Sequence, residues 1–333
     1  MSLSLEIIDA EKMNVHLDRI NGVSKDRWRF CRNLMNDFEF RAKSKEYNRA
    51  FFKLWEILAA YPALCNSAVS RSCHLGEAPG SFAQVCLQRN PSLRCVLLSK
   101  PPMTYAEVTR TGSSTPMFYP SLQSNPNVSC LYVDLNDDRA RDDAIQRVKK
   151  LAPGKLPFIT ADGGFDENGA YDQKEALHVG LIRSEVMAIL ALQEIGGSAV
   201  LKIYDSFMTE TIDVIYELCR HYDFWAVYKP KTSRPTNSER YIIVQGFKGD
   251  MCKDKISFSS FIECLTGASQ QMLKTQRKAI TEALSCCKGT QSATVKERKD
   301  IQARTFDQWC TETSFPDFLK TPRSRRTPAF RAL

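Results

Sequence analysis

The sequence lacks the patterns that mark zinc proteins, disulfide-rich secreted proteins and membrane proteins. It has 12 cysteines but no Cys-x-x-Cys pair and only four histidines, which argues against a zinc framework or a set of disulfides. No apolar run approaches the roughly 20 residues that span a bilayer, and the first residues have neither region of a secretory signal. Cysteines scattered over apolar segments are typical of a reducing compartment. We therefore expect an intracellular protein, cytoplasmic or nuclear, without a bound metal.

Two nucleotide-binding motifs are also missing. The chain contains neither a Gly-x-Gly-x-x-Gly fingerprint nor a Walker lysine, which disfavours dinucleotides and nucleoside triphosphates as ligands. Its 43% hydrophobic and 25% charged residues are ordinary for a globular protein. The net charge of +8 suits a polyanionic partner but does not identify one.

The apolar pattern alternates between two periods. Short apolar runs typical of strands occur at residues 72–75, 93–98, 128–133, 158–161, 199–204, 224–227 and 241–247. Segments with a helical period lie between most of them, at residues 82–88, 138–151, 172–194 and 209–221. Strands and helices in alternation predict an α/β fold with a doubly wound, mostly parallel sheet.

Residues 46–250 carry this alternating pattern and are predicted to form the main domain. Residues 1–45 are predicted to form an N-terminal helical extension and residues 251–315 a C-terminal one, followed by a basic tail at 316–333. The stretch 99–127 is rich in serine, threonine and proline, which predicts a long loop over a cleft or a mobile insert.

A glycine-bearing loop, Gly76-Glu-Ala-Pro-Gly80, follows the first predicted strand and precedes a helix that starts near Ser81. The two glycines allow a tight turn and close approach of a ligand to the backbone, and the helix N-terminus offers N–H donors. In a first βα turn this favours a nucleotide-type cofactor site, and the alternative is a plain strand–helix turn. Asp134 ends a later strand, where it could accept a hydrogen bond from an adenine amino group or a ribose, or cap a helix.

Four charged residues lie at the ends of separate predicted elements. Asp162 ends a strand and is followed by two glycines that clear room beside its carboxylate. Lys202 lies inside an apolar strand, where a lysine is costly unless paired. Burial and a neighbouring cation would lower its pKa and make it a general base, while the alternative is a lysine that reaches solvent. Lys53 lies in a helix, and Glu239 ends a polar loop just before the last strand.

Taken in order, these segments resemble the FtsJ-type ribose 2′-O-methyltransferases over about residues 48–249. The similar motifs are Asn-Arg-Ala-Phe-Phe-Lys53, the loop from His74 to Phe82, Gly196-Gly-Ser-Ala-Val-Leu-Lys202 and the block from Lys229 to Glu239. Thr160-Ala-Asp-Gly-Gly-Phe165 looks like the mRNA cap methyltransferases, nearest to the eukaryotic branch acting on the second nucleotide and to FtsJ-like proteins of large DNA viruses.

The resemblance implies a Rossmann-like class I methyltransferase with a seven-stranded sheet, S-adenosyl-L-methionine as cofactor and a catalytic set with Lys202 as general base. The chain departs from the family at His74, where many members have an acid, at Ser81, where Pro-Gly-Gly is commoner, and after residue 98, where no carboxylate follows. The implied catalytic residues are Lys53, Asp162, Lys202 and Glu239. The implied cofactor contacts are His74, Gly76, Glu77, Ala78, Pro79, Gly80, Ser81, Phe82, Asp134 and Asp162.

The implied partner is RNA, in particular the 5′ end of capped mRNA. Basic residues near the cleft would contact phosphates, with Arg49, Lys229, Lys231 and Arg234 as candidates. Candidates for stacking on a base or on the cap are Phe52, Tyr105 and Tyr204. A protein partner for the terminal helices stays open. So do two alternatives: a methyltransferase for rRNA or tRNA, and a catalytically silent RNA-binding subunit.

Overall fold

The computed structural model describes residues 19–39, 47–102, 116–164, 173–249, 257–289 and 292–316. Several expectations lie outside these residues. They concern Tyr105 and much of the predicted loop at 99–127, Phe165, the first 18 residues, and the basic tail from residue 317 onwards.

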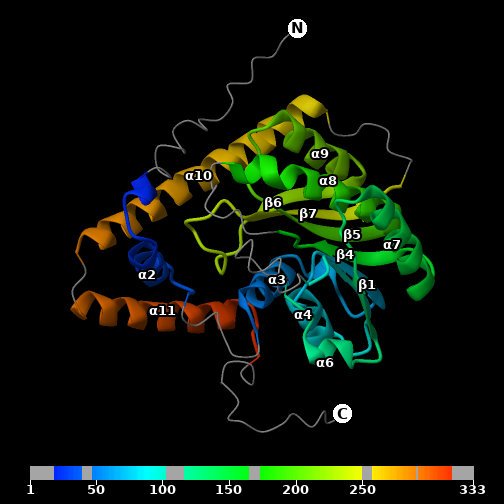
Figure 1. Ribbon diagram of the computed structural model, residues 1–333, viewed down its shortest axis with the longest axis horizontal. Helices are drawn as coiled ribbons and strands as arrows, with labels where there is room; N and C mark the ends of the chain where they lie inside the picture. Colours follow the sequence, from blue (N-terminus) through cyan, green and yellow to red (C-terminus); the bar gives the residue numbers. More distant parts are fainter. Residues whose placement is uncertain are drawn as a thin grey trace.

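A seven-stranded sheet forms the centre of the molecule (Figure 1). Strand order is β3-β2-β1-β4-β5-β7-β6, with β1 to β5 parallel to one another and β7 antiparallel to both β5 and β6. This confirms the predicted mostly parallel sheet. The strands are β1 (Arg71–Leu75), β2 (Arg94–Ser99), β3 (Val128–Tyr132), β4 (Leu156–Ala161), β5 (Gln193–Ile203), β6 (Tyr222–Tyr228) and β7 (Arg240–Phe247).

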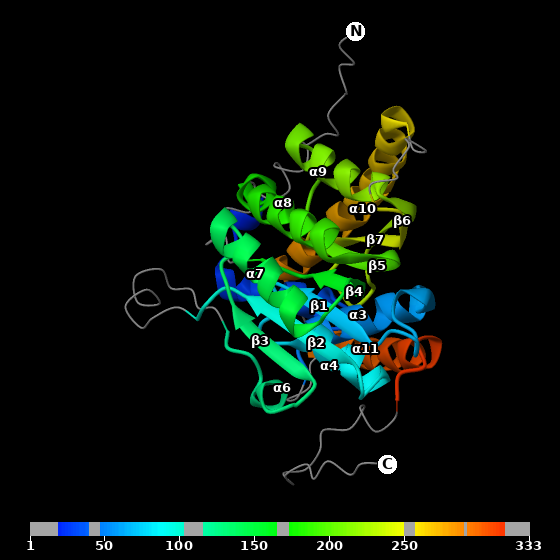
Figure 2. The same ribbon diagram turned by 90° about the vertical axis from the view of Figure 1, so that its right-hand side faces the viewer.

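Helices cover both faces of the sheet, as Figure 2 shows. Strand side chains alternate between two apolar clusters, so that Val200 faces one and its neighbours Ala199 and Leu201 face the other. One face packs against α7 (Asp138–Leu151), α8 (Lys174–Leu192), α9 (Thr209–Arg220) and the start of α10 (Phe258–Lys288). The other packs against α3 (Arg49–Ala60), α4 (Ser81–Arg89) and α11 (Ser292–Glu312), with the short helices η1 (Pro62–Leu64) and α6 (Pro120–Gln123) nearby.

Polar caps explain why several helices begin where they do. The side chain of Asn48 accepts from the backbone N–H of Ala50 at the start of α3, and Asp137 caps α7 in the same way. One boundary differs from the sequence expectation. The helix predicted to reach residue 194 ends at Leu192, and β5 begins at Gln193, six residues before its predicted start.

The terminal helices pack against each other. Trp28 of α2 (Lys25–Met35) forms a cluster with apolar residues of α10, and Arg27 donates to the carbonyls of Cys286 and Cys287, both at 3.3 Å. Arg298 of α11 donates to the carbonyl of Met35 at 3.0 Å. The two predicted extensions therefore meet in space, although they lie at opposite ends of the sequence (Figure 1).

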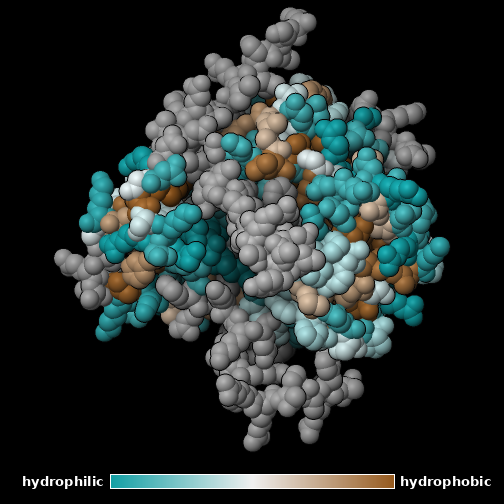
Figure 3. Space-filling view, viewed as in Figure 1, coloured by the Kyte–Doolittle hydropathy of each residue, from teal (hydrophilic) through white to brown (hydrophobic). Residues whose placement is uncertain are grey.

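Hydrophilic residues predominate over α2 and α11 on the face shown in Figure 3, and hydrophobic residues there are scattered. No helix in the described residues is long and apolar enough to cross a bilayer. The same residues contain no group of three or more histidine, cysteine or acidic side chains arranged to hold a metal.

Candidate active site

Lys202 and Asp162 meet where β4 and β5 end at the same edge of the sheet. Ala161 pairs with Leu201 in the parallel register, which brings the following residues side by side. The Lys202 Nζ donates to the backbone oxygen of Asp162 at 2.6 Å and lies 3.2 Å from its Oδ1. Tyr241, opposite Lys202 in the antiparallel register, donates its hydroxyl to the same Oδ1 at 3.1 Å.

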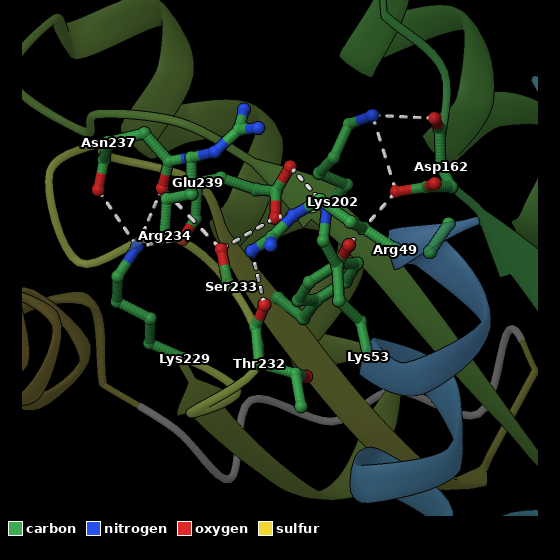
Figure 4. A network of polar contacts seen from close by, with 12 residues as sticks. Arg49, Lys53, Asp162, Lys202, Lys229, Thr232, Ser233, Arg234, Asn237 and Glu239 are labelled. Atoms are coloured by element: carbon green, nitrogen blue, oxygen red, sulfur yellow. Dashed lines mark hydrogen bonds and ion pairs between the residues drawn. The ribbon is translucent and has the colours of Figure 1, made fainter. Parts of the chain in front are cut away.

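Glu239 and Lys53 form a second ion pair next to the first (Figure 4). Lys53 extends from α3, and its Nζ lies 2.6 Å and 2.8 Å from the two oxygens of Glu239, which directly precedes β7. The hydroxyl of Ser233 donates to Glu239 Oε1 at 2.8 Å. The structure thus brings the four predicted residues into one polar network, and their catalytic roles stay predictions.

The charge state of Lys202 differs from the sequence expectation. Lys202 is only 7% exposed. Burial disfavours the ammonium form, but the negative charges around it, chiefly that of Asp162, outweigh burial and raise the pKa of Lys202 above its ordinary value. The predicted lowering is therefore wrong for the protein without substrate. In the same network Lys53 and Lys202 hold the pKa of buried Glu239 well below its usual range, against the effect of burial.

Two glycines make room at this edge, as the sequence predicted for the residues after Asp162. A Cβ on Gly164 would lie 3.2 Å from Lys202 Nζ, and one on Gly163 would lie 2.3 Å from Glu185 Oε1. Glu185, which sequence reasoning missed, is fully buried on α8 and accepts from the Gly163 N–H at 3.0 Å. Burial raises the pKa of Glu185 to about 8. In the sequence, the one indication of this role is that Glu185 is an acidic residue among the apolar residues of its helix.

The predicted cofactor loop joins β1 to α4. Gly76 has a φ of 63°, and a Cβ there would lie 2.2 Å from the Cα of Gly163, so these two loops touch through their backbones. Gly76, Ala78 and Pro79 are partly exposed, whereas Gly80, Ser81 and Phe82 are buried.

Glu77 uses part of the helix terminus that the sequence suggested for a ligand. Its Oε1 accepts from the backbone N–H of Ala83 at 2.9 Å, so it caps α4 from inside the protein. Burial raises the pKa of Glu77 to about 8. Gly76, Ala78 and Pro79 are therefore the partly exposed residues of this loop, while the carboxylate of Glu77 is used to cap α4.

His74 lies in the core rather than at the edge. Its Nε2 lies 2.8 Å from the Ser72 hydroxyl and its Nδ1 2.8 Å from the Thr160 hydroxyl, and the residue is 0% exposed. Burial lowers the pKa of His74 to about 3, which keeps the ring neutral. The expected contact of this side chain with a cofactor is therefore corrected to a structural role between β1 and β4.

Asp134 follows β3 at the carboxyl edge, as predicted. Its Oδ2 lies 3.0 Å from Nζ of Lys100, which follows β2, and its Oδ1 accepts from the Asn136 N–H at 3.1 Å. The side chain is 37% exposed, so the carboxylate can be reached from solvent. Its predicted contact with the cofactor stays a prediction.

Lys229, predicted to contact phosphate, braces its own loop instead. Its Nζ donates to Asn237 O at 2.8 Å, Asn237 Oδ1 at 2.9 Å and Glu239 O at 2.7 Å. An ammonium has three donors, and all three are used here. Burial lowers the pKa of Lys229 to about 7. The phosphate role is thus corrected to one of shaping the loop that presents Glu239.

Arg49 and Arg234, two other predicted RNA contacts, share one buried carboxylate that the sequence did not reveal. Arg49 Nη1 donates to Glu39 Oε2 at 2.8 Å, and Arg234 binds both oxygens of Glu39 at 3.0 Å and 2.8 Å. Their guanidinium groups outweigh burial and lower the pKa of Glu39 to about 2. Lys231, by contrast, is 63% exposed beside Glu312 at 3.0 Å and stays a candidate for phosphate contact.

Of the predicted stacking residues, Phe52 is 2% exposed and packs against Phe306, Trp309 and Phe315, so its ring is not available to a base. Tyr204 is 8% exposed, and Nζ of Lys174 lies 3.9 Å from the centre of its ring.

The strand order and the polar edge at β1, β4 and β5 define a class I Rossmann-like methyltransferase fold. Residues 47–247 match the FtsJ-like methyltransferase family, and the chain belongs to that family.

Relatives share part of this chain. It is 31% identical over 166 residues to the cap-specific mRNA (nucleoside-2′-O-)-methyltransferase of Autographa californica nuclear polyhedrosis virus, covering 50% of this chain and 60% of that protein. It is 26% identical over 256 residues to cap-specific mRNA (nucleoside-2′-O-)-methyltransferase 2 of Drosophila melanogaster, covering 72% of this chain and 34% of that protein. The match therefore spans less than two thirds of either relative. A Plasmodium falciparum structure described as a ribosomal RNA methyltransferase aligns with a TM-score of 0.47 and 20% identity, covering 61% of this chain and 98% of that one.

Proposed function

We propose that this protein transfers a methyl group from S-adenosyl-L-methionine to a ribose 2′-hydroxyl of RNA in the 5′ cap region of mRNA. One observation carries the proposal. The ion pairs Lys202–Asp162 and Lys53–Glu239 lie together at the carboxyl edge of the sheet, next to the loop that begins at Gly76. In doubly wound α/β folds, ligands bind outside this edge.

The residues present suit the cofactor. Gly76 and Gly163 bring two loops into backbone contact, so that the loop with the partly exposed residues Gly76, Ala78 and Pro79 touches the residue after Asp162. Asp134 follows β3, two strands from β1 along the same edge, and offers an accessible carboxylate for a hydroxyl or amino group. When bound, the cofactor supplies an electrophilic methyl group on a positively charged sulfur.

Lys202 is proposed as the group that takes the proton from the 2′-hydroxyl as the new O–CH₃ bond forms. A lysine must be neutral to accept a proton, and the pKa of Lys202 is raised by Asp162. An added positive charge nearby would oppose Asp162 and lower that pKa. Asp162 would then hold the amine in place through its backbone oxygen at 2.6 Å. General-base assistance contributes about 10²–10⁴-fold in rate.

The cap region is proposed because two relatives, one viral and one eukaryotic, carry cap-specific names. Lys231, exposed at the loop that leads to Glu239, would contact a phosphate of the substrate. Since each such contact is electrostatic, binding should weaken with added salt.

Transfer of tritiated methyl groups to a short RNA, capped or uncapped and otherwise identical, tests the proposal. Wild type, Lys202→Ala and the exposed control Lys150→Ala on α7 are compared. We expect transfer to capped RNA only, a loss of about 10²-fold or more in Lys202→Ala, and no change in Lys150→Ala. Transfer to uncapped RNA would indicate a different RNA substrate. Cofactor binding without transfer to either RNA would support a silent subunit.

A further inference from the structure

Glu56 lies three residues after Lys53 on the same helix, α3, and is 3% exposed. Five hydrogen bonds reach it, all from neutral donors. Oε1 accepts from the Tyr228 hydroxyl at 3.0 Å and from the Lys231 N–H at 2.7 Å. Oε2 accepts from the N–H and hydroxyl of Thr232 at 3.1 Å and 2.9 Å, and from the Trp309 indole N–H at 3.1 Å.

A buried carboxylate is costly unless donors replace its water, and here five do. All five partners are donors, so both oxygens of the Glu56 carboxyl group act as acceptors. An amide in its place would turn an NH₂ group towards at least two of these donors, whichever way it was oriented. The arrangement therefore depends on two oxygens that both accept hydrogen bonds, which a glutamine of the same shape cannot supply.

The five donors come from three parts of the chain: the end of β6, the loop that follows it, and α11. Lys231 and Thr232 belong to the loop after β6, and the next residue, Ser233, donates to Glu239 at 2.8 Å. Glu239 in turn pairs with Lys53 at 2.6 Å. Glu56 thus fixes the backbone one residue before the contact that orients Glu239, from the helix that also carries Lys53 (Figure 4 shows Thr232, Ser233, Glu239 and Lys53).

The third element is the C-terminal helix α11, which supplies Trp309. Its ring lies 6.1 Å from Phe52 and 5.5 Å from Phe306, within an aromatic cluster that packs α11 onto α3. Trp309 is 1% exposed, so this contact belongs to the core. A helix outside residues 47–247, the part that matches the family, therefore contributes to the support of the site.

We propose that Glu56 and Trp309 are positioning residues for methyl transfer, which hold the loop after β6 so that Ser233 and Glu239 face Lys53. This inference rests on the proposed function. It makes the C-terminal helix a part of the catalytic unit rather than a separate docking element.

Three variants test the inference in the full-length protein: Glu56→Gln, Trp309→Phe, which keeps a ring but loses the N–H, and Tyr228→Phe, which loses one donor. We expect kcat to fall about 10²-fold in Glu56→Gln, the loss that a misplaced reacting group causes, and by less in the two milder variants. Cofactor affinity should stay within about twofold of wild type, since the cofactor loop lies on other strands. The control Phe306→Leu removes packing next to Trp309 but no hydrogen bond to Glu56.

A double-mutant cycle that combines Glu56→Gln with Ser233→Ala tests whether Glu56 acts through Ser233. If Glu56 acts through Ser233, the double variant loses little more kcat than Glu56→Gln alone, because the two changes break one network. Variants that lower the melting temperature as Phe306→Leu does but keep wild-type kcat would overturn the inference, and so would additive losses in the cycle. Wild-type transfer is measured first: its absence would refute the proposed function, whereas normal transfer in all variants would refute only the positioning role.

Discussion

Lys202 and Asp162 contact each other through both backbone and side chain, with Nζ 2.6 Å from the carbonyl oxygen and 3.2 Å from Oδ1 of Asp162. The carbonyl contact is set by the register of β4 and β5, so it survives changes to the carboxylate. The two contacts can therefore be separated by mutation. The backbone oxygen positions the Lys202 amine, and the carboxylate raises its pKa.

Asp162→Asn should move the pH dependence of methyl transfer to lower pH. The carboxylate is the largest cause that raises the pKa of Lys202, so its removal lets burial lower that pKa. More of the lysine is then neutral at a given pH, although the maximal rate falls as the Oδ1 contact weakens. Single-turnover rates from pH 6 to pH 10 measure the shift. An unchanged profile with a lower plateau would mean that Lys202 is not the titrating base.

Gly76→Ala should destabilise the protein by about 3 kcal/mol or more, because the added Cβ overlaps a backbone and the φ is left-handed. The overlap is with the Cα of Gly163, at 2.2 Å. Gly196→Ala is the matched control, since its φ of 78° is also left-handed but nothing lies within 4 Å of the new Cβ. It should cost only about 1–2 kcal/mol. Urea unfolding measures both, and equal losses would contradict the close approach of the two loops.

Glu39 should make stability depend on pH in the acid range. Its folded pKa of about 2 lies below the ordinary value of 4.5. The contribution of Glu39 to the free energy of unfolding is therefore complete above pH 4.5 and is lost as pH falls from 4.5 towards 2. The contribution is at most about 3 kcal/mol, reduced by solvent around the partly exposed Arg234.

The variant Glu39→Gln should be less stable than wild type at pH 7 and should converge with it as pH falls. Urea unfolding between pH 7 and pH 3 provides the comparison, with the exposed Glu263→Gln on α10 as control. A constant difference across this range would show that the two arginines do not act through the charge of Glu39.

Glu185 should act in the opposite direction. Its folded pKa of about 8 lies above the ordinary 4.5, so between these values the folded state holds a proton that the unfolded state has lost. Stability should therefore decrease as pH rises through this window, by up to about 1.4 kcal/mol per pH unit. Glu185→Gln, which mimics the protonated group, should flatten this slope. Unfolding midpoints in urea at pH 5.5, 6.5 and 7.5 check this, and parallel curves would be inconsistent with a buried proton on Glu185.

Local patterns in the sequence were enough to predict the sheet, and together with the order of the motifs they predicted the convergence of four charged residues. Apolar alternation depends on neighbours two to four residues apart, which a sequence displays directly. Once parallel strands are predicted, residues that follow them must meet at one edge, which is why Asp162, Lys202 and Asp134 could be placed there. The glycines after Asp162 were predicted to clear space, and they do so.

Other residues could not be assigned without the fold. His74 and Lys229 are polar residues next to matching motifs, and only the positions of Thr160 and Asn237 show that their donors are already used. Glu39 and Glu56 lie in segments without a distinctive motif. The partners of Glu56, and Arg234 as one of the two partners of Glu39, are more than 170 residues away in the sequence.

The sequence by itself determined the fold class, the family and the set of residues at the sheet edge, because these follow from short-range periodicity and from the order of motifs. Only the tertiary structure decided which of these residues carry charge and what holds them. Protonation depends on burial and on charges brought close from distant segments. For Lys202 the sequence predicted a lowered pKa, but the carboxylate of Asp162, 40 residues away in the sequence, raises it.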